Sequence, residues 1–98
     1  MKEITTAELK QKLENGETLH MIDVREEDEV AQGMIPDAIH IPLGEIPDRL
    51  EELDQATSYV IICRSGGRSG RAAEFLEAQG YDATNMVGGM LDWQGDVE

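Results

Sequence analysis

The chain has 98 residues and a net charge of −13, and 40% of its residues are hydrophobic but only 4% are aromatic. We expect a single domain over residues 1–98 with an aliphatic core, because a chain of this length is too short for two independent cores. The negative charge repels polyanions and therefore argues against nucleic acid and anionic membranes as partners.

The first third of the chain predicts a helix, a strand and a second helix. Thr5 and Glu8 have the spacing of a capping box and predict a helix over residues 6–15. Residues 19–24 are mostly apolar without strict alternation, which is typical of a strand buried on both faces. The acidic run 26–29 then predicts a short helix.

The middle of the chain predicts two strands around a helix. Glycine and proline residues on both sides of residues 38–41 leave room only for a short strand. Pro47 suits the first turn of a helix, and apolar residues recur at helical spacing as far as Leu53. The longest uninterrupted apolar run, residues 59–63, predicts a central strand.

The last third begins with a glycine-rich loop over residues 64–70, and a helical pattern then runs to Gly80. Residues 83–87 predict a last strand, which leads through two glycines into a short segment that holds Trp93. The alternation of strands and helices predicts an α/β fold with a mainly parallel central sheet flanked by helices on both faces.

Cys63 ends the central strand and immediately precedes the glycine-rich loop, where open parallel sheets bind their ligands. Gly66 and Gly67 allow several backbone N–H groups to converge on one point, and the next helix adds the positive end of its dipole. A helix N-terminus with Arg64 and Arg68 nearby lowers the pKa of a thiol. We therefore expect Cys63 to be a nucleophilic thiolate.

The charge pattern indicates an anionic substrate. Residues 64–71 carry +3 and contain no acid, whereas the rest of the chain carries −16. The alternative is an inert core thiol with arginines that only solvate a helix, but the adjacent glycines and arginines favour the reactive interpretation. Without a resolving cysteine, Cys63 has to pass its cargo to an outside acceptor.

Other polar residues near the predicted site either tune its chemistry or only support its loops. Asp23 and Arg25 fall where their strand ends on the same side of the sheet, and we expect a charge pair that supports the loops. Ser65 and Ser69 either donate to the bound sulfur or serve only as turn and capping residues, and the sequence favours neither interpretation.

Four features in this order resemble the rhodanese (thiosulfate sulfurtransferase) superfamily. They are residues 22–25, residues 33–42, the loop Cys63–Ser69, and Gly88 and Gly89 followed by Trp93. The resemblance implies a three-layer rhodanese-like α/β domain in which Cys63 accepts sulfane sulfur as a persulfide. The implied donor is a small anion such as thiosulfate or another persulfide, and the implied acceptor is a small or protein thiol, or cyanide.

Two alternatives stay open within this resemblance. Related phosphatases and arsenate reductases place one more residue between the cysteine and the arginine, whereas four residues separate Cys63 from Arg68. A tighter ring of donors suits one terminal sulfur better than a tetrahedral oxyanion, so the spacing favours sulfur transfer. The other alternative is a regulatory binding module, but inactive relatives usually lack the cysteine.

No segment approaches the roughly 20 apolar residues that a membrane span needs, and the first residues lack the apolar region of a signal peptide. A lone free thiol fits a reduced compartment, so we expect a cytoplasmic protein. We expect no metal or other cofactor, because one cysteine and two histidines cannot supply the usual four ligands of structural zinc.

Overall fold

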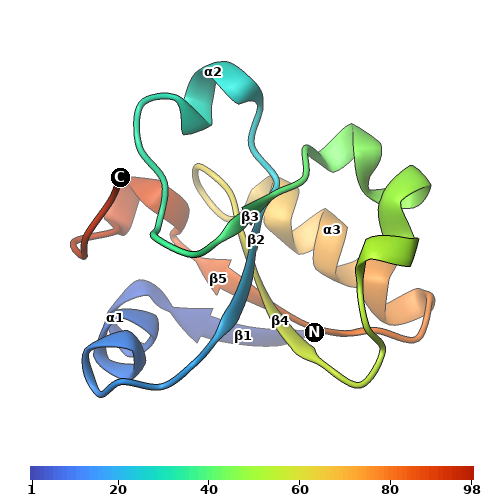
Figure 1. The fold of residues 1–98 in the computed structure, drawn as a ribbon, viewed down its shortest axis with the longest axis horizontal. Helices are drawn as coiled ribbons and strands as arrows, with labels where there is room; N and C mark the ends of the chain where they lie inside the picture. The colour runs from blue at the N-terminus through green and yellow to red at the C-terminus, as the bar shows by residue number, and fades with distance from the viewer.

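The computed structural model describes all 98 residues, which form a five-stranded, fully parallel sheet with helices on both faces (Figure 1). The strand order is β1-β5-β4-β2-β3. The strands are β1 (Lys2–Thr5), β2 (His20–Asp23), β3 (Ile39–His40), β4 (Ser58–Ile62) and β5 (Asp82–Val87). The helices are α1 (Thr6–Glu14), α2 (Glu27–Val30), the 3₁₀ segment η1 (Leu43–Glu52), α3 (Gly67–Ala78) and the 3₁₀ turn η2 (Gly89–Asp92). The predicted fold class is confirmed.

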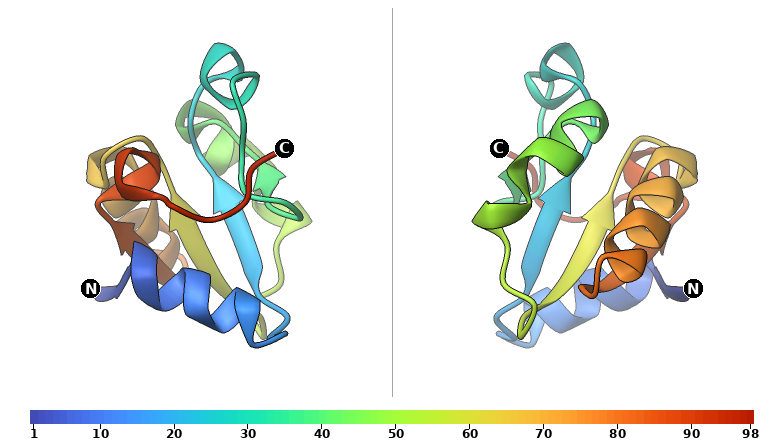
Figure 2. Two further views of the ribbon diagram at one scale, coloured as in Figure 1. Left: turned by 90° about the vertical axis from the view of Figure 1, so that its left-hand side faces the viewer. Right: turned by 90° about the vertical axis from the view of Figure 1, so that its right-hand side faces the viewer.

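The sheet separates two clusters of buried aliphatic side chains, because side chains alternate between the faces of each strand. On one face, Ile61 and Cys63 pack with residues of α3 and η1. On the other face, Val60 and Ile62 pack with residues of α1 and the segment around η2. The end views show α1 and α3 on opposite sides of the strands (Figure 2). The central strand β4 is therefore buried on both faces, as its unbroken apolar pattern predicts.

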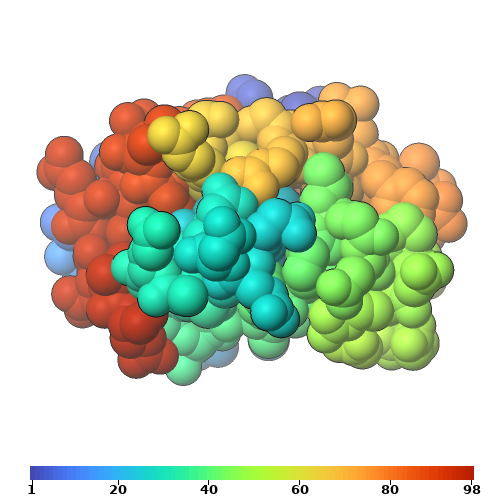
Figure 3. Space-filling view, turned by 90° about the horizontal axis from the view of Figure 1, so that it is seen from above, coloured from blue at the N-terminus to red at the C-terminus, as the bar shows by residue number.

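All five strands point the same way, so their carboxyl ends meet at one edge of the sheet. The short helix α2 lies beyond this edge, above the strands in Figures 1 and 2. Figure 3 looks down on the edge and shows α2 beside the loop that follows β4. This is where a parallel sheet places its ligands. No helix has the length and apolar character needed to cross a membrane.

Strand β1 is not predicted from the sequence. It is a four-residue edge strand with three exposed residues, and only Ile4 is partly buried, opposite Met86 of β5. Such a short, mostly polar segment carries no strand periodicity. It is a strand because β5 presents a free edge to which it pairs, and this contact is invisible in the local sequence.

The helix predicted from Pro47 differs in start and type. The segment begins at Leu43, four residues earlier, and it is a 3₁₀ helix with a break at Arg49, where φ is −123° and ψ is 20°. The Leu43 N–H donates to the Val24 carbonyl, which ties the start of the segment to the end of β2. The break leaves two short helical pieces, the usual length for 3₁₀ structure.

Helix α1 has the predicted capping box and ends one residue earlier than expected. The Thr5 hydroxyl accepts from the Glu8 N–H at 3.0 Å, and the Glu8 carboxylate accepts from the Thr5 N–H at 2.9 Å. Two backbone donors that have no partner within the helix are satisfied in this way.

We expect Thr5→Ala to lower the free energy of unfolding by about 1 kcal/mol, because it removes the acceptor for the Glu8 N–H. Thr5→Ser is the matched control, since it keeps the hydroxyl and should retain most of the stability. Urea denaturation followed by circular dichroism measures both values. Equal losses in the two variants would mean that packing of the Thr5 methyl group, and not the cap, is responsible.

Candidate active site

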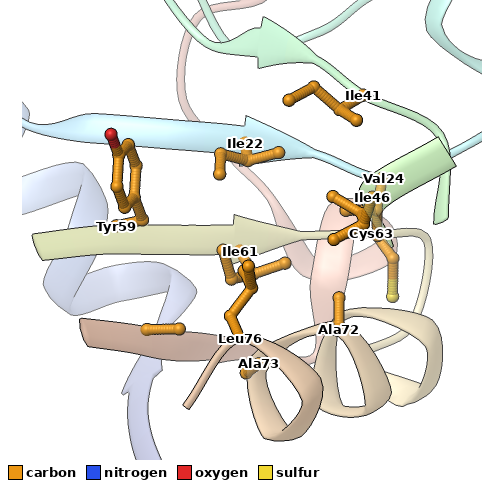
Figure 4. Close-up of a cluster of buried hydrophobic side chains, with 11 residues drawn as sticks. Ile22, Val24, Ile41, Ile46, Tyr59, Ile61, Cys63, Ala72, Ala73 and Leu76 are labelled. Carbon is orange, nitrogen blue, oxygen red and sulfur yellow. The ribbon is translucent and has the colours of Figure 1, made fainter. Parts of the chain in front are cut away.

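Cys63 follows the last residue of β4, and the residue is 1% exposed. Figure 4 shows it at the end of the apolar cluster, with its sulfur turned toward the beginning of α3. The chain reverses direction at Gly66, whose φ of +106° favours glycine. A Cβ there would also lie 3.3 Å from the Gly88 nitrogen, so the turn needs glycine for space as well.

Two groups of the loop donate hydrogen bonds to the Cys63 sulfur. The Gly66 N–H lies 3.0 Å from Sγ, and the Ser69 hydroxyl lies 3.2 Å from it. Ser69 is fully buried in the first turn of α3, whereas Ser65 and Gly67 are exposed at the rim of the loop. Of the two serines that were candidates to donate to the sulfur, only Ser69 places its hydroxyl within hydrogen-bond distance of Sγ.

Burial is the largest single influence on Cys63, and it raises the pKa of the thiol because a charged sulfur would lose its contact with water. The Ser69 hydroxyl lowers the pKa most, the backbone N–H groups of Ser69, Gly66 and Ser65 also lower it, and together these donors outweigh burial. The pKa of Cys63 therefore lies below its ordinary value, as the sequence predicts. The main cause, however, is the set of hydrogen-bond donors and not the arginines.

Arg68 is paired with an acid from a distant part of the chain. Its two terminal nitrogens each donate to one carboxylate oxygen of Glu29 on α2, both at 2.7 Å. The paired Arg68 guanidinium lowers the pKa of Glu29 to about 2, and Glu29 in turn raises the pKa of Arg68. The net charge of +3 over residues 64–71 is thus partly neutralised by Glu29 in the folded protein. The same ion pair joins the loop to α2.

Asp23 and Arg25 form the charge pair that the sequence predicts. Their closest atoms are 2.8 Å apart, and both side chains are buried. Arg25 also donates to the carbonyls of Gly33, at 2.8 Å, and Glu29, at 3.4 Å. Arg25 therefore ties the C-terminal part of α2 and the residues that follow it to the end of β2, while Arg68 holds α2 through the Glu29 carboxylate.

Arg64 is exposed directly after Cys63. A shallow pocket of about 280 Å³ lies beside it, lined by Arg25, Glu29, Gln32, Arg64, Met90 and Leu91. A larger pocket of about 580 Å³ lies between α1 and residues 93–96, but no cysteine, histidine or hydroxyl side chain lines it. No group of three or more histidine, cysteine or acidic side chains is arranged to hold a metal ion.

The η2 turn holds the backbone at the start of the loop. The Met90 N–H donates to the Cys63 carbonyl and the Leu91 N–H to the Arg64 carbonyl, both at 2.9 Å. Gly89 approaches so closely that a Cβ would lie 2.4 Å from the Arg64 carbonyl carbon. Gly89 is therefore a packing requirement of the loop, whereas a Cβ at Gly88 would meet the Asp92 side chain of η2.

Asn85 on β5 is a site residue that is not predicted from the sequence. Its side-chain oxygen accepts from the Ser69 hydroxyl at 2.5 Å, and its side-chain nitrogen donates to the Gly66 carbonyl at 3.1 Å. Asn85 is 4% exposed. The available signal is an amide flanked by strand residues, because a polar side chain that is buried in a sheet needs a partner.

Comparisons with known proteins agree with this architecture. Residues 5–96 match the protein family described as Rhodanese-like domain. The chain is 51% identical over 98 residues to "Putative sulfurtransferase YtwF" of Bacillus subtilis, covering 100% of this chain and 95% of that protein. It is 42% identical over 92 residues to "Sulfurtransferase" of Allochromatium vinosum, covering 93% and 86% of the two chains. A solved rhodanese-like domain protein from Staphylococcus aureus has a TM-score of 0.95 at 44% identity, covering 100% of this chain and 97% of that one.

We expect Glu29→Gln to lower the free energy of unfolding by about 1 kcal/mol at neutral pH, because it leaves the Arg68 guanidinium without its carboxylate. The pKa of Glu29 is lowered from 4.5 to about 2, so its stabilisation is complete above pH 4.5 and is lost as the pH falls toward 2. The difference between the native protein and the variant should therefore shrink over that range.

Glu27→Gln is the control, since Glu27 is exposed on the same helix. Urea denaturation at a series of pH values gives the unfolding free energies. A native-to-variant difference that stays constant between pH 4.5 and 2 would contradict the proposed strength of the pair.

Proposed function

Because this chain belongs to the rhodanese-like domain family, we propose that it is a sulfurtransferase in which Cys63 carries sulfane sulfur as a persulfide. The observation that carries the proposal is the buried Cys63 sulfur, which receives hydrogen bonds from the Gly66 N–H and the Ser69 hydroxyl. These donors stabilise negative charge on sulfur where water cannot. The match over residues 5–96 also supports a single domain over residues 1–98.

In the first half-reaction, the Cys63 thiolate attacks the outer sulfur of thiosulfate. A new S–S bond forms at Sγ, and the S–S bond of thiosulfate breaks. Sulfite leaves with the bonding electron pair, and the negative charge of Cys63 passes to the terminal sulfur of the persulfide. No proton and no external oxidant are needed, because one sulfur–sulfur bond replaces another.

In the second half-reaction, a nucleophile attacks the terminal sulfur. The bond between that sulfur and Sγ breaks, and its electron pair returns to Cys63 as a thiolate. Cyanide leaves as thiocyanate, and a thiolate acceptor becomes a persulfide. The lack of a second cysteine supports an outside acceptor, either a small thiol or a protein thiol. The lone reduced thiol also supports our expectation of a cytoplasmic location.

The Arg68 contact speaks against phosphatase or arsenate reductase chemistry. Both terminal nitrogens of Arg68 are engaged with Glu29, so its guanidinium is not free to bind two oxygens of a tetrahedral oxyanion. Four residues separate Cys63 from Arg68, which also favours a single terminal sulfur in the loop. The lowered pKa of Cys63 supports a catalytic over a purely regulatory module.

We expect thiosulfate to increase the mass of the intact protein by one sulfur atom and cyanide to remove it. Cys63→Ser is the matched control, because it preserves size but removes the nucleophile. Mass spectrometry before and after cyanide measures the loading directly. A Cys63→Ser protein that still turns over thiosulfate would refute the mechanism, and hydrolysis of an aryl phosphate without sulfur loading would favour the phosphatase alternative.

We expect Arg64→Gln to raise the KM for thiosulfate roughly threefold to tenfold, because Arg64 is the exposed cation next to Cys63 in a chain that repels dianions. Discharge of the preformed persulfide to cyanide should change little. Arg71→Gln is the control, since Arg71 is exposed on α3 and carries the same charge. Single-turnover kinetics of each half-reaction decide the role, and equal effects of the two substitutions would assign the KM change to net charge alone.

A further inference from the structure

Asn85 contacts both residues that donate hydrogen bonds to the Cys63 sulfur. Its Oδ1 lies 2.5 Å from the Ser69 hydroxyl oxygen, and its Nδ2 lies 3.1 Å from the Gly66 carbonyl oxygen. Asn85 is opposite Ile61 of β4, whose side chain lies on the Cys63 face of the sheet. A single buried amide therefore connects the turn of the loop with the first turn of α3.

The Ser69 hydroxyl has one proton and two acceptors. The Cys63 sulfur lies 3.2 Å from its oxygen, and Asn85 Oδ1 lies 2.5 Å from it. A hydroxyl donates its proton to one acceptor at a time. The orientation of the amide is fixed by the Gly66 carbonyl, which needs a donor and so leaves Oδ1 to face Ser69.

The charge on sulfur decides which acceptor wins. A thiolate is the stronger acceptor, because hydrogen bonds to charged groups are stronger than those between neutral groups. A thiol or a persulfide leaves Sγ uncharged, and the amide oxygen is then the better partner for the Ser69 hydroxyl.

We propose that Asn85 is a positioning residue for sulfur transfer. It holds Gly66 in place, and it accepts a hydrogen bond from the Ser69 hydroxyl whenever the Cys63 sulfur carries no charge. This inference rests on the proposed sulfurtransferase function. In the free enzyme, Ser69 donates to the thiolate. After sulfur transfer the charge lies on the terminal sulfur, and Ser69 turns to Asn85. Discharge of the persulfide returns the charge to Sγ, and Ser69 turns back.

Asn85 thus stabilises the loaded enzyme relative to the thiolate. Without it, the buried Ser69 hydroxyl would have no good acceptor once Sγ becomes neutral, and an unpaired buried hydroxyl is unfavourable. The amide also competes with the thiolate for the Ser69 proton, so its removal should favour the thiolate.

The charged side chains around Cys63 are the same with and without the Asn85 side chain. Arg68 of α3 is paired with Glu29 of α2, and Arg64 follows Cys63 in the loop. The Asp23–Arg25 pair lies at the end of β2, the strand next to β4. Substitution of Asn85 changes none of these side chains.

The test combines Asn85→Leu with Ser69→Ala in a double-mutant cycle. Leucine resembles asparagine in size but forms no hydrogen bond. The pKa of Cys63 is measured from the rate of alkylation by iodoacetamide as a function of pH. We expect Asn85→Leu to lower this pKa in the native background more than in the Ser69→Ala background. The two decreases in pKa should differ by about 0.5–1, which corresponds to one hydrogen bond. Loosening of the loop would act in both backgrounds alike, so equal shifts would overturn the proposal.

Asn85→Asp provides a second test if the leucine variant fails to fold. A carboxylate competes more strongly for the Ser69 proton, so the pKa of Cys63 should rise more in the native background than with Ser69→Ala. Equal rises would again overturn the proposal.

The equilibrium between thiosulfate and sulfite tests the loaded state. Because Asn85 favours the persulfide, Asn85→Leu should shift the ratio of persulfide to thiolate toward the thiolate roughly threefold to tenfold at a pH where Cys63 is ionised. Intact mass measured at fixed ratios of sulfite to thiosulfate gives this value. An unchanged ratio would refute the proposed role of Asn85. A native protein that never takes up sulfur would instead refute the proposed function, and the double-mutant cycle of alkylation rates would still test the contact between Asn85 and Ser69.

Discussion

The sulfur of a cysteine that is 1% exposed carries a negative charge only if hydrogen-bond donors replace the water that it loses. Much of the structure around Cys63 meets this constraint. The left-handed turn at Gly66 aims a backbone N–H at the sulfur, and α3 begins where Ser69 adds a hydroxyl. The parallel sheet supplies the position, since β4 ends at the edge where the loop and α3 begin.

Some of the acidic residues of the chain pair with arginines next to the Cys63 loop and do not only contribute charge to the surface. Glu29 neutralises Arg68, and Arg25 is bound to Asp23 and to two carbonyls of the α2 segment. Two arginines thereby hold a helix of only four residues, which could not persist without such contacts. Of the arginines near the site, Arg64 remains exposed. Charge counted along the chain therefore overstates the positive charge that a substrate meets.

The sequence predicts those features whose cause is local. The Thr5 cap, the strand before Cys63 and the glycine-rich turn all follow from neighbouring residues. The edge strand β1, the Glu29 contact with Arg68 and the Asn85 contact with Ser69 depend on partners that only folding brings together. Glu29 and Arg68 are 39 residues apart in the chain, and Asn85 and Ser69 are 16 apart. No periodicity or spacing encodes such pairs in a single sequence.

The contacts between η2 and the loop fix the backbone of Arg64 but leave its side chain free of them. The carbonyl of Arg64 is held by the Leu91 N–H, and Gly89 packs against its backbone, yet the side chain itself is exposed. Substitution at position 64 thus changes the charge at the mouth of the site while its backbone anchor is kept. The side chain at position 64 can therefore vary at little cost to folding, so the charge at the mouth of the loop is set independently of the loop's backbone shape.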